Sequence, residues 1–190
     1  GDAYIDLDTF DFYVKASGAW VLSGNIKGDS NENVSPDHNG TIGLEFYPLN
    51  DTECAVGVGT AICLEEIVIP STYKGLKVTT ISEFRDSMNC STGFYGCENL
   101  KTITIPDSVT TIGYSAFSSC DSLTSVTIPD SVTTIGDYAF YYCTSLTSVT
   151  IGDSVTTIGE DAFYWCFSLT SVTMGDSVTT IGDWAFRDCD

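Results

Sequence analysis

The sequence predicts a β-rich α/β solenoid, with a parallel strand ladder, short helical or 3-10 turns and a β-rich N-terminal cap. Two observations predict this class: a 23-residue segment recurs through the second half of the chain, and each copy keeps its apolar residues at fixed places. A single copy cannot bury its own apolar residues, but stacked copies share a continuous core. The third observation is that residues 1–68 lack the period, so the chain of 190 residues divides into residues 1–68 and 69–190.

Residues 1–68 are predicted to be mostly β-structure. The segments YIDLDTFDFYV, AWVLSGNI and TIGLEFYPL alternate apolar with polar residues, as half-buried strands do. The intervening KGDSNENVSPDHNG consists almost entirely of turn-forming residues and predicts an exposed loop. We expect this region to cover one open end of the solenoid, where terminal strands would otherwise expose unpaired backbone.

The regular repeats occupy residues 105–190, and a degenerate first copy with an insertion occupies residues 69–104. Full copies begin at Ile105, Ile128 and Ile151, and a shorter copy begins at Met174. In each, SVTI or a close variant predicts a strand, and DYAFYYC is long enough for one or two helical or 3-10 turns only. In-register stacking, with about 4.8 Å between neighbouring strands, places equivalent side chains in columns.

One of these columns consists of cysteines. Its members are Cys97, Cys120, Cys143, Cys166 and Cys189. Neighbours lie within disulfide range, but their side chains point the same way, which favours buried free thiols. A straight column also cannot supply the tetrahedral ligands of a zinc site, so no metal is predicted.

The other three cysteines precede the regular repeats. Cys54 and Cys63 flank a predicted hairpin, and we expect a disulfide between them in an oxidising compartment. Cys90 lies in the insertion, where it either pairs with Cys97 or remains a free thiol.

The repeat pattern L-x-x-V-x-I-P-x-x-V-x-x-I-G-x-x-A-F-x-x-C resembles the BspA-like, or Treponema-type, leucine-rich repeat family, over residues 69–190. The resemblance implies a secreted or cell-surface protein that acts in adhesion and protein binding. It implies no catalytic residues, and no cofactor is expected. Residues 44–81 are similar to the hairpin that often leads into such repeats.

Charge and motifs exclude several function classes. The chain has 26 acidic and 7 basic residues, a net charge of −19, which argues against nucleic acid and anionic membranes as partners. Its apolar runs are far shorter than the roughly 20 residues needed to span a bilayer, so no membrane insertion is expected. The single histidine, His38, lies among turn formers, and the hydrolase, zinc-protease and phosphate-loop motifs are missing, so we predict no enzyme.

The variable positions around AF-x-x-C are the predicted partner-binding surface. They are Tyr138, Tyr141, Tyr142, Tyr164, Trp165, Phe167 and Trp184. Residues beside a buried Phe and Cys should face outward, and exposed aromatic clusters commonly mark interaction sites. The alternative is that the rings only cover one another. The expected partner is a protein or a glycan, or further copies of this chain in an assembly.

Four N-x-S/T sequons predict glycosylation. They begin at Asn33, Asn39, Asn50 and Asn89, all before the regular repeats. The interpretation is a glycoprotein of a secretory pathway, and coincidence in a chain rich in Ser and Thr is the alternative.

Two further ladders leave alternatives open. Rows of Ser and Thr, such as Thr127, Thr150 and Thr173, suit exposed strands, and evenly spaced Thr side chains also suggest an ice-binding or other surface-binding protein. A second such face carries the Thr pairs that begin at Thr110. Columns of acids, such as Asp107 and Asp130, predict a solvated face, with loose calcium association as the alternative.

Overall fold

The computed structural model describes residues 3–6, 11–16, 19–25, 40–41, 43–59, 64–81 and 93–189. The chain forms two units, Gly1–His38 and Asn39–Asp190. The strands of the first unit are β1 (Ala3–Asp6), β2 (Asp11–Ala16) and β3 (Ala19–Asn25). They pair antiparallel in the order β1-β2-β3. The stretch is β-structure as predicted, but the single strand predicted for YIDLDTFDFYV corresponds to two strands, β1 and β2.

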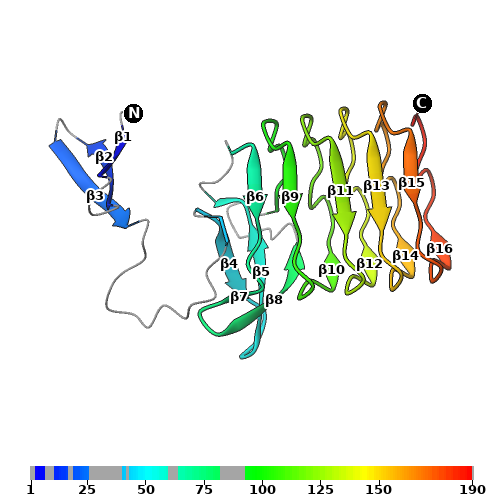
Figure 1. Ribbon diagram of the computed structural model, residues 1–190, viewed down its shortest axis with the longest axis horizontal. Helices are drawn as coiled ribbons and strands as arrows, with labels where there is room; N and C mark the ends of the chain where they lie inside the picture. The colour runs from blue at the N-terminus through cyan, green and yellow to red at the C-terminus, as the bar shows by residue number, and fades with distance from the viewer. Residues whose placement is uncertain are drawn as a thin grey trace. The chain divides into compact units, whose positions relative to one another are not determined.

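The second unit is a solenoid whose coils stack along one direction (Figure 1). One side is an eight-stranded sheet of order β16-β14-β12-β10-β8-β5-β4, in which β7 pairs with β8. Its strands are β4 (Glu45–Pro48), β5 (Glu53–Gly57), β7 (Thr72–Tyr73), β8 (Leu76–Ile81), β10 (Thr111–Ile112), β12 (Thr134–Ile135), β14 (Thr157–Ile158) and β16 (Thr180–Ile181). From β5 to β16 the strands along this order pair parallel, as predicted.

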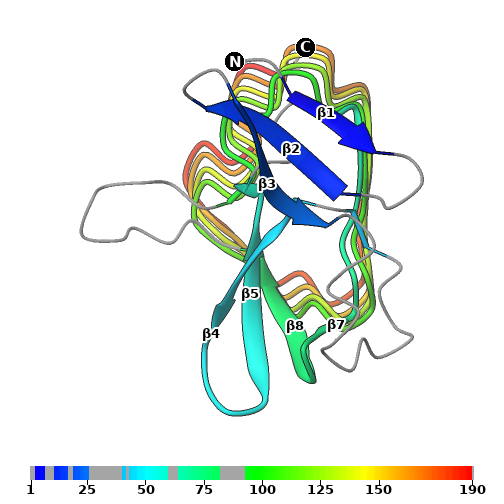
Figure 2. The same cartoon turned by 90° about the vertical axis from the view of Figure 1, so that its left-hand side faces the viewer.

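A second row of strands lies on another side of the coils. It comprises β6 (Glu66–Val68), β9 (Thr102–Thr104), β11 (Ser125–Ile128), β13 (Ser148–Ile151) and β15 (Ser171–Thr173). β6 pairs with β9, and β11, β13 and β15 form a three-stranded sheet, all parallel. Residues one period apart are paired on adjacent strands, for example Thr127 with Thr150, which confirms the predicted columns. Seen from the end in Figure 2, the regular coils superimpose.

The core lies between the two rows of strands. Phe94, Phe117, Phe140 and Phe163 are fully buried, and with Phe186 their rings stack from coil to coil at centroid distances of 5.0–5.2 Å. Burying four phenylalanine side chains completely contributes roughly 1.5–3 kcal/mol each, so this column is a principal source of cohesion.

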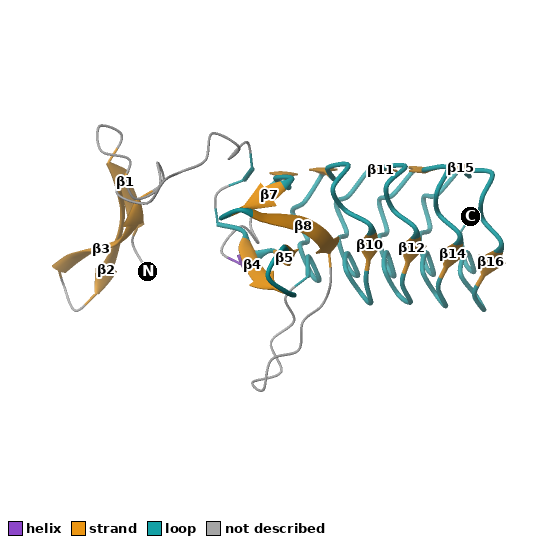
Figure 3. Cartoon of the chain, turned by 90° about the horizontal axis from the view of Figure 1, so that it is seen from below, coloured by secondary structure: helices purple, strands orange, loops and turns teal. Residues whose placement is uncertain are grey.

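The predicted α/β class and its short helical or 3-10 turns are wrong. The described residues contain no α-helix, only Gly59 has 3-10 geometry, and the AF-x-x-C segments are consecutive turns (Figure 3). In these segments Tyr138 and Tyr142 have φ of 58° and 61°. This left-handed conformation interrupts a right-handed helix, and it recurs at two positions in each regular coil.

Hydrogen bonds between coils explain why turns replace the helix. Alternate N–H groups around Phe140 donate to the following coil at 2.7–2.9 Å: Tyr138 to Glu160, Phe140 to Ala162 and Tyr142 to Tyr164. The N–H groups between them close local turns, such as Tyr141 to Tyr138 at 3.0 Å. Because half of the donors serve the neighbouring coil, a continuous i to i−4 helical ladder cannot form.

The eight-stranded sheet ends at a hairpin. β4 pairs antiparallel with β5, and β5 continues the parallel ladder through β8. Phe46 of β4 stacks on Tyr73 of β7 at 4.0 Å between centroids. Residues 39–68 therefore belong with the solenoid unit, whereas the predicted cap spanned residues 1–68.

Candidate binding surface

The predicted aromatic residues lie together on the turn side of the coils. We call them the aromatic surface: Tyr138, Tyr141, Tyr142, Tyr164, Trp165, Phe167 and Trp184. Phe167 and Trp184 are 43 % and 57 % exposed, and the other five are half-buried. The rings are thus both accessible and partly covered by one another.

Ring contacts link these residues across coils. Tyr141 stacks on Tyr164 with centroids 5.6 Å apart and planes 8° from parallel. Tyr142 stands edge-on to Trp165 at 5.4 Å and to Phe167 at 6.2 Å, and the Trp165 and Phe167 centroids are 6.2 Å apart. Such arrangements contribute about 0.5–1.5 kcal/mol per pair beyond burial. Tyr142, Trp165 and Phe167 therefore form a compact group, which we call the ring trio.

Four members of the aromatic surface have a left-handed backbone conformation. Tyr138, Tyr142, Trp165 and Trp184 have φ of 58–61°. Bulky side chains are rare at positive φ, where a residue other than glycine costs on the order of 1–3 kcal/mol. The backbone path of the coil therefore disfavours aromatic residues at these positions.

Other coils fill the same positions with residues that suit this conformation. One period and two periods before Tyr142 stand Ser119 and Gly96, with φ of 59° and 71°, and Asp188 follows Trp165 with φ of 56°. Gly, Ser and Asp therefore all satisfy the coil at this position. The backbone of the coil therefore does not require an aromatic side chain at Tyr142 or Trp165.

The charge around the rings is mostly negative, with one cation. The Arg187 guanidinium carbon lies 5.9 Å from the centroid of Tyr164 and 5.5 Å from that of Trp184. Asp188 accepts a hydrogen bond from the indole N–H of Trp165 at 3.1 Å and lies 3.6 Å from Arg187 Nε. Partial burial and then the Asp161 carboxylate raise the pKa of Tyr138, so its phenol stays neutral at physiological pH.

Two residues of this region were not among the partner-binding residues predicted from the sequence. The Tyr114 ring lies 5.4 Å from that of Tyr138 and is 47 % exposed, which extends the rings by one coil. Arg187 occupies the column of Tyr141 and Tyr164 and is the only basic residue after Lys101. That isolation in the sequence was the signal that could have singled it out.

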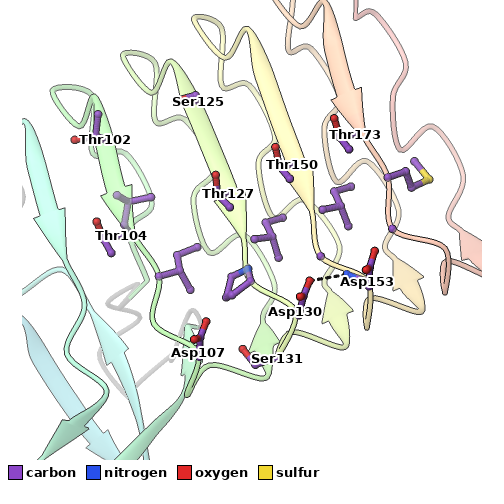
Figure 4. A pocket seen from close by; sticks show the side chains of 18 residues that line it. Thr102, Thr104, Asp107, Ser125, Thr127, Asp130, Ser131, Thr150, Asp153 and Thr173 are labelled. Carbon is purple, nitrogen blue, oxygen red and sulfur yellow. Dashed lines mark hydrogen bonds between the residues drawn. The ribbon is translucent and has the colours of Figure 1, made fainter.

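A second candidate surface is a groove of about 920 Å³ along β9, β11, β13 and β15 (Figure 4). We call it the Ser/Thr groove. Exposed hydroxyl side chains line it, together with a row of acids: Thr102, Thr104, Ser125, Thr127, Thr150, Thr173, Asp107, Asp130 and Asp153. The predicted Ser and Thr rows are thus present and in register.

One of the two rows of the other predicted threonine face bonds the main chain. The hydroxyls of Thr110, Thr133, Thr156 and Thr179 each donate to a main-chain carbonyl of the preceding coil at 3.2–3.3 Å. These hydroxyls stabilise the stack and are not a free rank of water-binding groups.

The acidic columns are partly satisfied by the backbone. Asp130 Oδ1 accepts from the N–H of Asp153 at 2.9 Å, and Asp137 Oδ1 accepts from the N–H of Glu160 at 2.8 Å. These charge-assisted bonds offset repulsion between neighbouring carboxylates. Among the described residues no group of three or more His, Cys, Asp or Glu side chains is placed to hold a metal ion.

The cysteine column is buried, as predicted, and it also makes hydrogen bonds. Cys97, Cys120, Cys143 and Cys166 are free, fully buried thiols, and Cys189 is half-buried. Cys143 Sγ donates to the carbonyl of Phe117 in the preceding coil at 3.1 Å, and Cys120 and Cys166 repeat this bond at 3.1 and 3.3 Å. The Cys189 thiol and then burial raise the pKa of Cys166, so the thiol form persists.

The remaining predicted sites lie mostly outside the described residues, namely Cys63, Cys90, Asn33, Asn39 and Asn89. Cys54 is a free, fully buried thiol in β5, so the structure does not bear out the predicted disulfide with Cys63. Asn50 is exposed in the β4–β5 turn, where its Oδ1 accepts from the hydroxyl of Thr52, the third sequon residue, at 2.9 Å. Its amide group donates to Glu53 at 2.8 Å, and its glycosylation also stays a prediction.

In the described part of the chain, no helix is long and apolar enough to cross a bilayer.

Solved structures of leucine-rich repeat proteins resemble the chain. The T. pallidum leucine rich repeat protein is 22 % identical with a TM-score of 0.46, and the match covers 77 % of this chain and 86 % of that one. A leucine rich cell surface protein from Faecalibacterium prausnitzii is 28 % identical with a TM-score of 0.41, covering 78 % and 51 %. The pneumococcal vaccine antigen PcpA is 18 % identical with a TM-score of 0.47, covering 77 % and 40 %.

The family assignment rests on the sequence of the repeats. No curated protein matches the chain. The family profile described as BspA type leucine rich repeat region matches residues 61–190 in six copies, which is most of the chain. Its extent agrees with the stacked coils between β6 and β16. The chain therefore belongs to the BspA-type leucine-rich repeat family.

Proposed function

We propose that this protein is an extracellular or cell-surface binding protein that mediates adhesion or assembly through its aromatic surface. The observation that carries the proposal is the placement of Tyr138, Tyr142, Trp165 and Trp184 at positive φ. Aromatic side chains are retained there although Gly, Ser and Asp satisfy the same backbone positions in other coils. Residues held in a backbone conformation that is unfavourable for their type cluster at functional sites.

The chemistry of this surface suits recognition of a protein or a glycan. Tyr and Trp supply large, rigid contact areas and are enriched among the residues that dominate interface energetics. Rings linked from Tyr114 to Trp165 present such contact area over several coils. Partners in this class include extracellular proteins, glycans and further copies of this chain. The role is non-catalytic and needs no cofactor.

The extracellular location is supported by the family to which the chain belongs and by the sequons, which also suggest a glycoprotein. Labelling intact source cells with an antibody against the full chain tests this location. Surface labelling supports it, and signal that requires permeabilised cells overturns it.

The binding role is tested with the full chain on arrays of extracellular matrix proteins and glycans. The test variant is Tyr142→Gly with Trp165→Gly, because the coil itself accommodates Gly96 at this position. We expect at least one ligand of the wild-type protein to be lost in this variant and retained in a matched variant, Thr127→Ala with Thr150→Ala. If every wild-type signal survives the aromatic change, the aromatic surface is not the binding site.

Ice or surface binding is the second candidate, and the Ser/Thr groove favours it. Thr127, Thr150 and Thr173 are exposed, in register on adjacent strands, and make no hydrogen bond through their hydroxyls within the described residues. A thermal-hysteresis measurement on the wild-type protein and on the Thr127→Ala, Thr150→Ala variant tests this function. Activity lost in the variant supports it, and no hysteresis in the wild-type protein rejects it.

A further inference from the structure

The aromatic surface already holds one guanidinium group from its own chain. Arg187 lies over Tyr164 and Trp184, with its charge beside the Asp188 carboxylate. A cation over an aromatic face is stabilised by the ring quadrupole, and arginine favours this setting because its flat guanidinium is weakly hydrated. The contact shows which chemistry this surface accommodates.

The ring trio also combines aromatic rings with a carboxylate, but no cation of the described residues lies over its rings. Tyr142 stands edge-on to Trp165 and Phe167 at 68° and 74°, whereas the planes of Trp165 and Phe167 are 31° apart, so two of the three rings present their faces in similar directions. The Asp188 carboxylate, which neighbours Arg187, also bonds the indole N–H of Trp165. One carboxylate, that of Asp188, therefore lies both at the edge of the trio and beside Arg187.

The charge of the solenoid indicates what is attracted to this place. After Lys101 the sequence contains eleven acidic residues and a single basic one, Arg187. A field of this sign steers cationic partners to the surface and repels anionic ones. Aromatic faces with carboxylates in an acidic field match an arginine-bearing protein better than a neutral glycan.

We infer that the ring trio of Tyr142, Trp165 and Phe167 seats an arginine side chain of a basic protein partner, as Tyr164 and Trp184 seat Arg187. This inference rests on the proposed function and names the partner class for the same surface. The guanidinium lies against the ring faces, and the partner's other cations face the acidic columns. Arginine is preferred to lysine because its planar group stacks on rings as well as carrying charge.

The test measures binding of fluorescent arginine and lysine peptides of equal length to the full chain, by anisotropy at about 150 mM salt, where distant charges are screened. We expect the arginine peptide to bind more tightly than the lysine peptide. The Tyr142→Gly, Trp165→Gly variant keeps the net charge of the protein, so it removes the rings alone. Loss of cation–π contacts should weaken arginine-peptide binding by about tenfold.

A ring-preserving variant, Tyr142→Phe with Trp165→Phe, is the matched control and should bind close to wild-type affinity. Circular dichroism and thermal melting of both variants establish that the coil is intact. Equal affinity of the wild-type protein and the glycine variant, or equal affinity for arginine and lysine peptides, would show that net charge alone attracts the peptide and would overturn the inference.

The array experiment separates this inference from the proposed function. Ring-dependent binding of an array ligand without arginine-peptide binding leaves the proposed function standing and rejects the cation seat. Ring-dependent peptide binding without any array ligand supports the cation seat and counts against adhesion.

Discussion

Cys143 donates a hydrogen bond from its Sγ to the main-chain carbonyl of Phe117, across 3.1 Å and between two neighbouring coils. The same bond joins Cys120 to Phe94 and Cys166 to Phe140. Cysteine recurs in this column with two roles. It fills a small buried space, and it gives a second donor to a buried carbonyl that already accepts a local main-chain N–H, as Phe117 does from Cys120.

Replacing this thiol should destabilise the stack measurably. Cys143→Ala removes the sulfur and its hydrogen bond from a fully buried site, and we expect a loss of about 2 kcal/mol in the free energy of unfolding. Cys189→Ala is the matched control, because Cys189 makes a 3.1 Å bond to Phe163 but is only half-buried. Urea denaturation should give a smaller loss for Cys189→Ala, and equal losses would contradict the role of burial.

Neighbouring coils approach closely at Gly136, so adding a single methyl group there should lower the stability of the fold strongly. A Cβ at Gly136 would lie 2.8 Å from the carbonyl carbon of Gly113 and 2.9 Å from the N of Tyr114. Gly136→Ala must therefore push two backbones apart, and we expect a loss of about 3 kcal/mol. Gly96→Ala is the comparison, since only its φ of 71° is unfavourable and the space beside it is open; it should cost about 1 kcal/mol. Thermal melts that rank the two in the opposite order would contradict this packing.

The carboxylate of Asp137 should stabilise the coil as an acceptor and not through its charge. Its Oδ1 accepts from the N–H of Glu160, so Asp137→Ala should cost about 1 kcal/mol. Asp137→Asn keeps the acceptor oxygen and removes one charge from an acidic column, so stability should be unchanged or slightly higher. A loss for Asp137→Asn equal to that for Asp137→Ala, measured by urea denaturation, would show that the charge itself is needed.

Asp121 should make the stability of the folded chain depend on pH. Burial and then the charge of Glu98 raise the pKa of Asp121. A carboxyl pKa that is higher in the folded state favours folding while the group is protonated, and this contribution is lost as the pH rises through the folded pKa. Thr144 occupies the equivalent place in the next coil, so Asp121→Thr should stabilise the protein at neutral pH and lose this advantage below the ordinary carboxyl pKa of 3.8. A pH-independent difference in melting temperature would reject the titration of Asp121 as the cause.

Replacement by glycine should destabilise the fold less at Tyr142 than at its neighbour Tyr141, because it relieves backbone strain only at Tyr142. Both are half-buried and both touch other rings, but only Tyr142 has positive φ. Tyr142→Gly exchanges lost ring contacts for a relaxed backbone, so the net change in the free energy of unfolding should be within about 1 kcal/mol. Tyr141→Gly has no such compensation and should cost more. Equal losses for the two variants would mean that the left-handed conformation carries little strain.

The solenoid could be predicted from the sequence because its period is regular. The 23-residue spacing of Phe117, Phe140 and Phe163 requires stacked, buried equivalents, and the structure has them. The alternation in SVTI likewise predicted the strands of the second row. In both cases burial acts on side chains whose apolar character is visible in the sequence.

The turns could not be predicted in the same way. The segment DYAFYYC has the length and composition of a short helical turn, and neither Tyr138 nor Tyr142 belongs to a residue type that signals positive φ. The decisive factor is hydrogen bonding to the next coil, which single-segment reasoning does not include. Comparison along the column, where Gly96 and Ser119 precede Tyr142, carried the available hint.

The alternating hydrogen bonds of the turn side have a consequence for how such a protein can change its length. N–H groups at the same positions of each coil donate to carbonyls of the next coil. Ser115 donates to Asp137 in this way, and Tyr138, one period later, donates to Glu160. Inserting or deleting one whole 23-residue unit therefore recreates an identical junction. A gene encoding near-identical repeats can extend or shorten the outward-facing ring display in steps of one coil, while every interior contact is preserved.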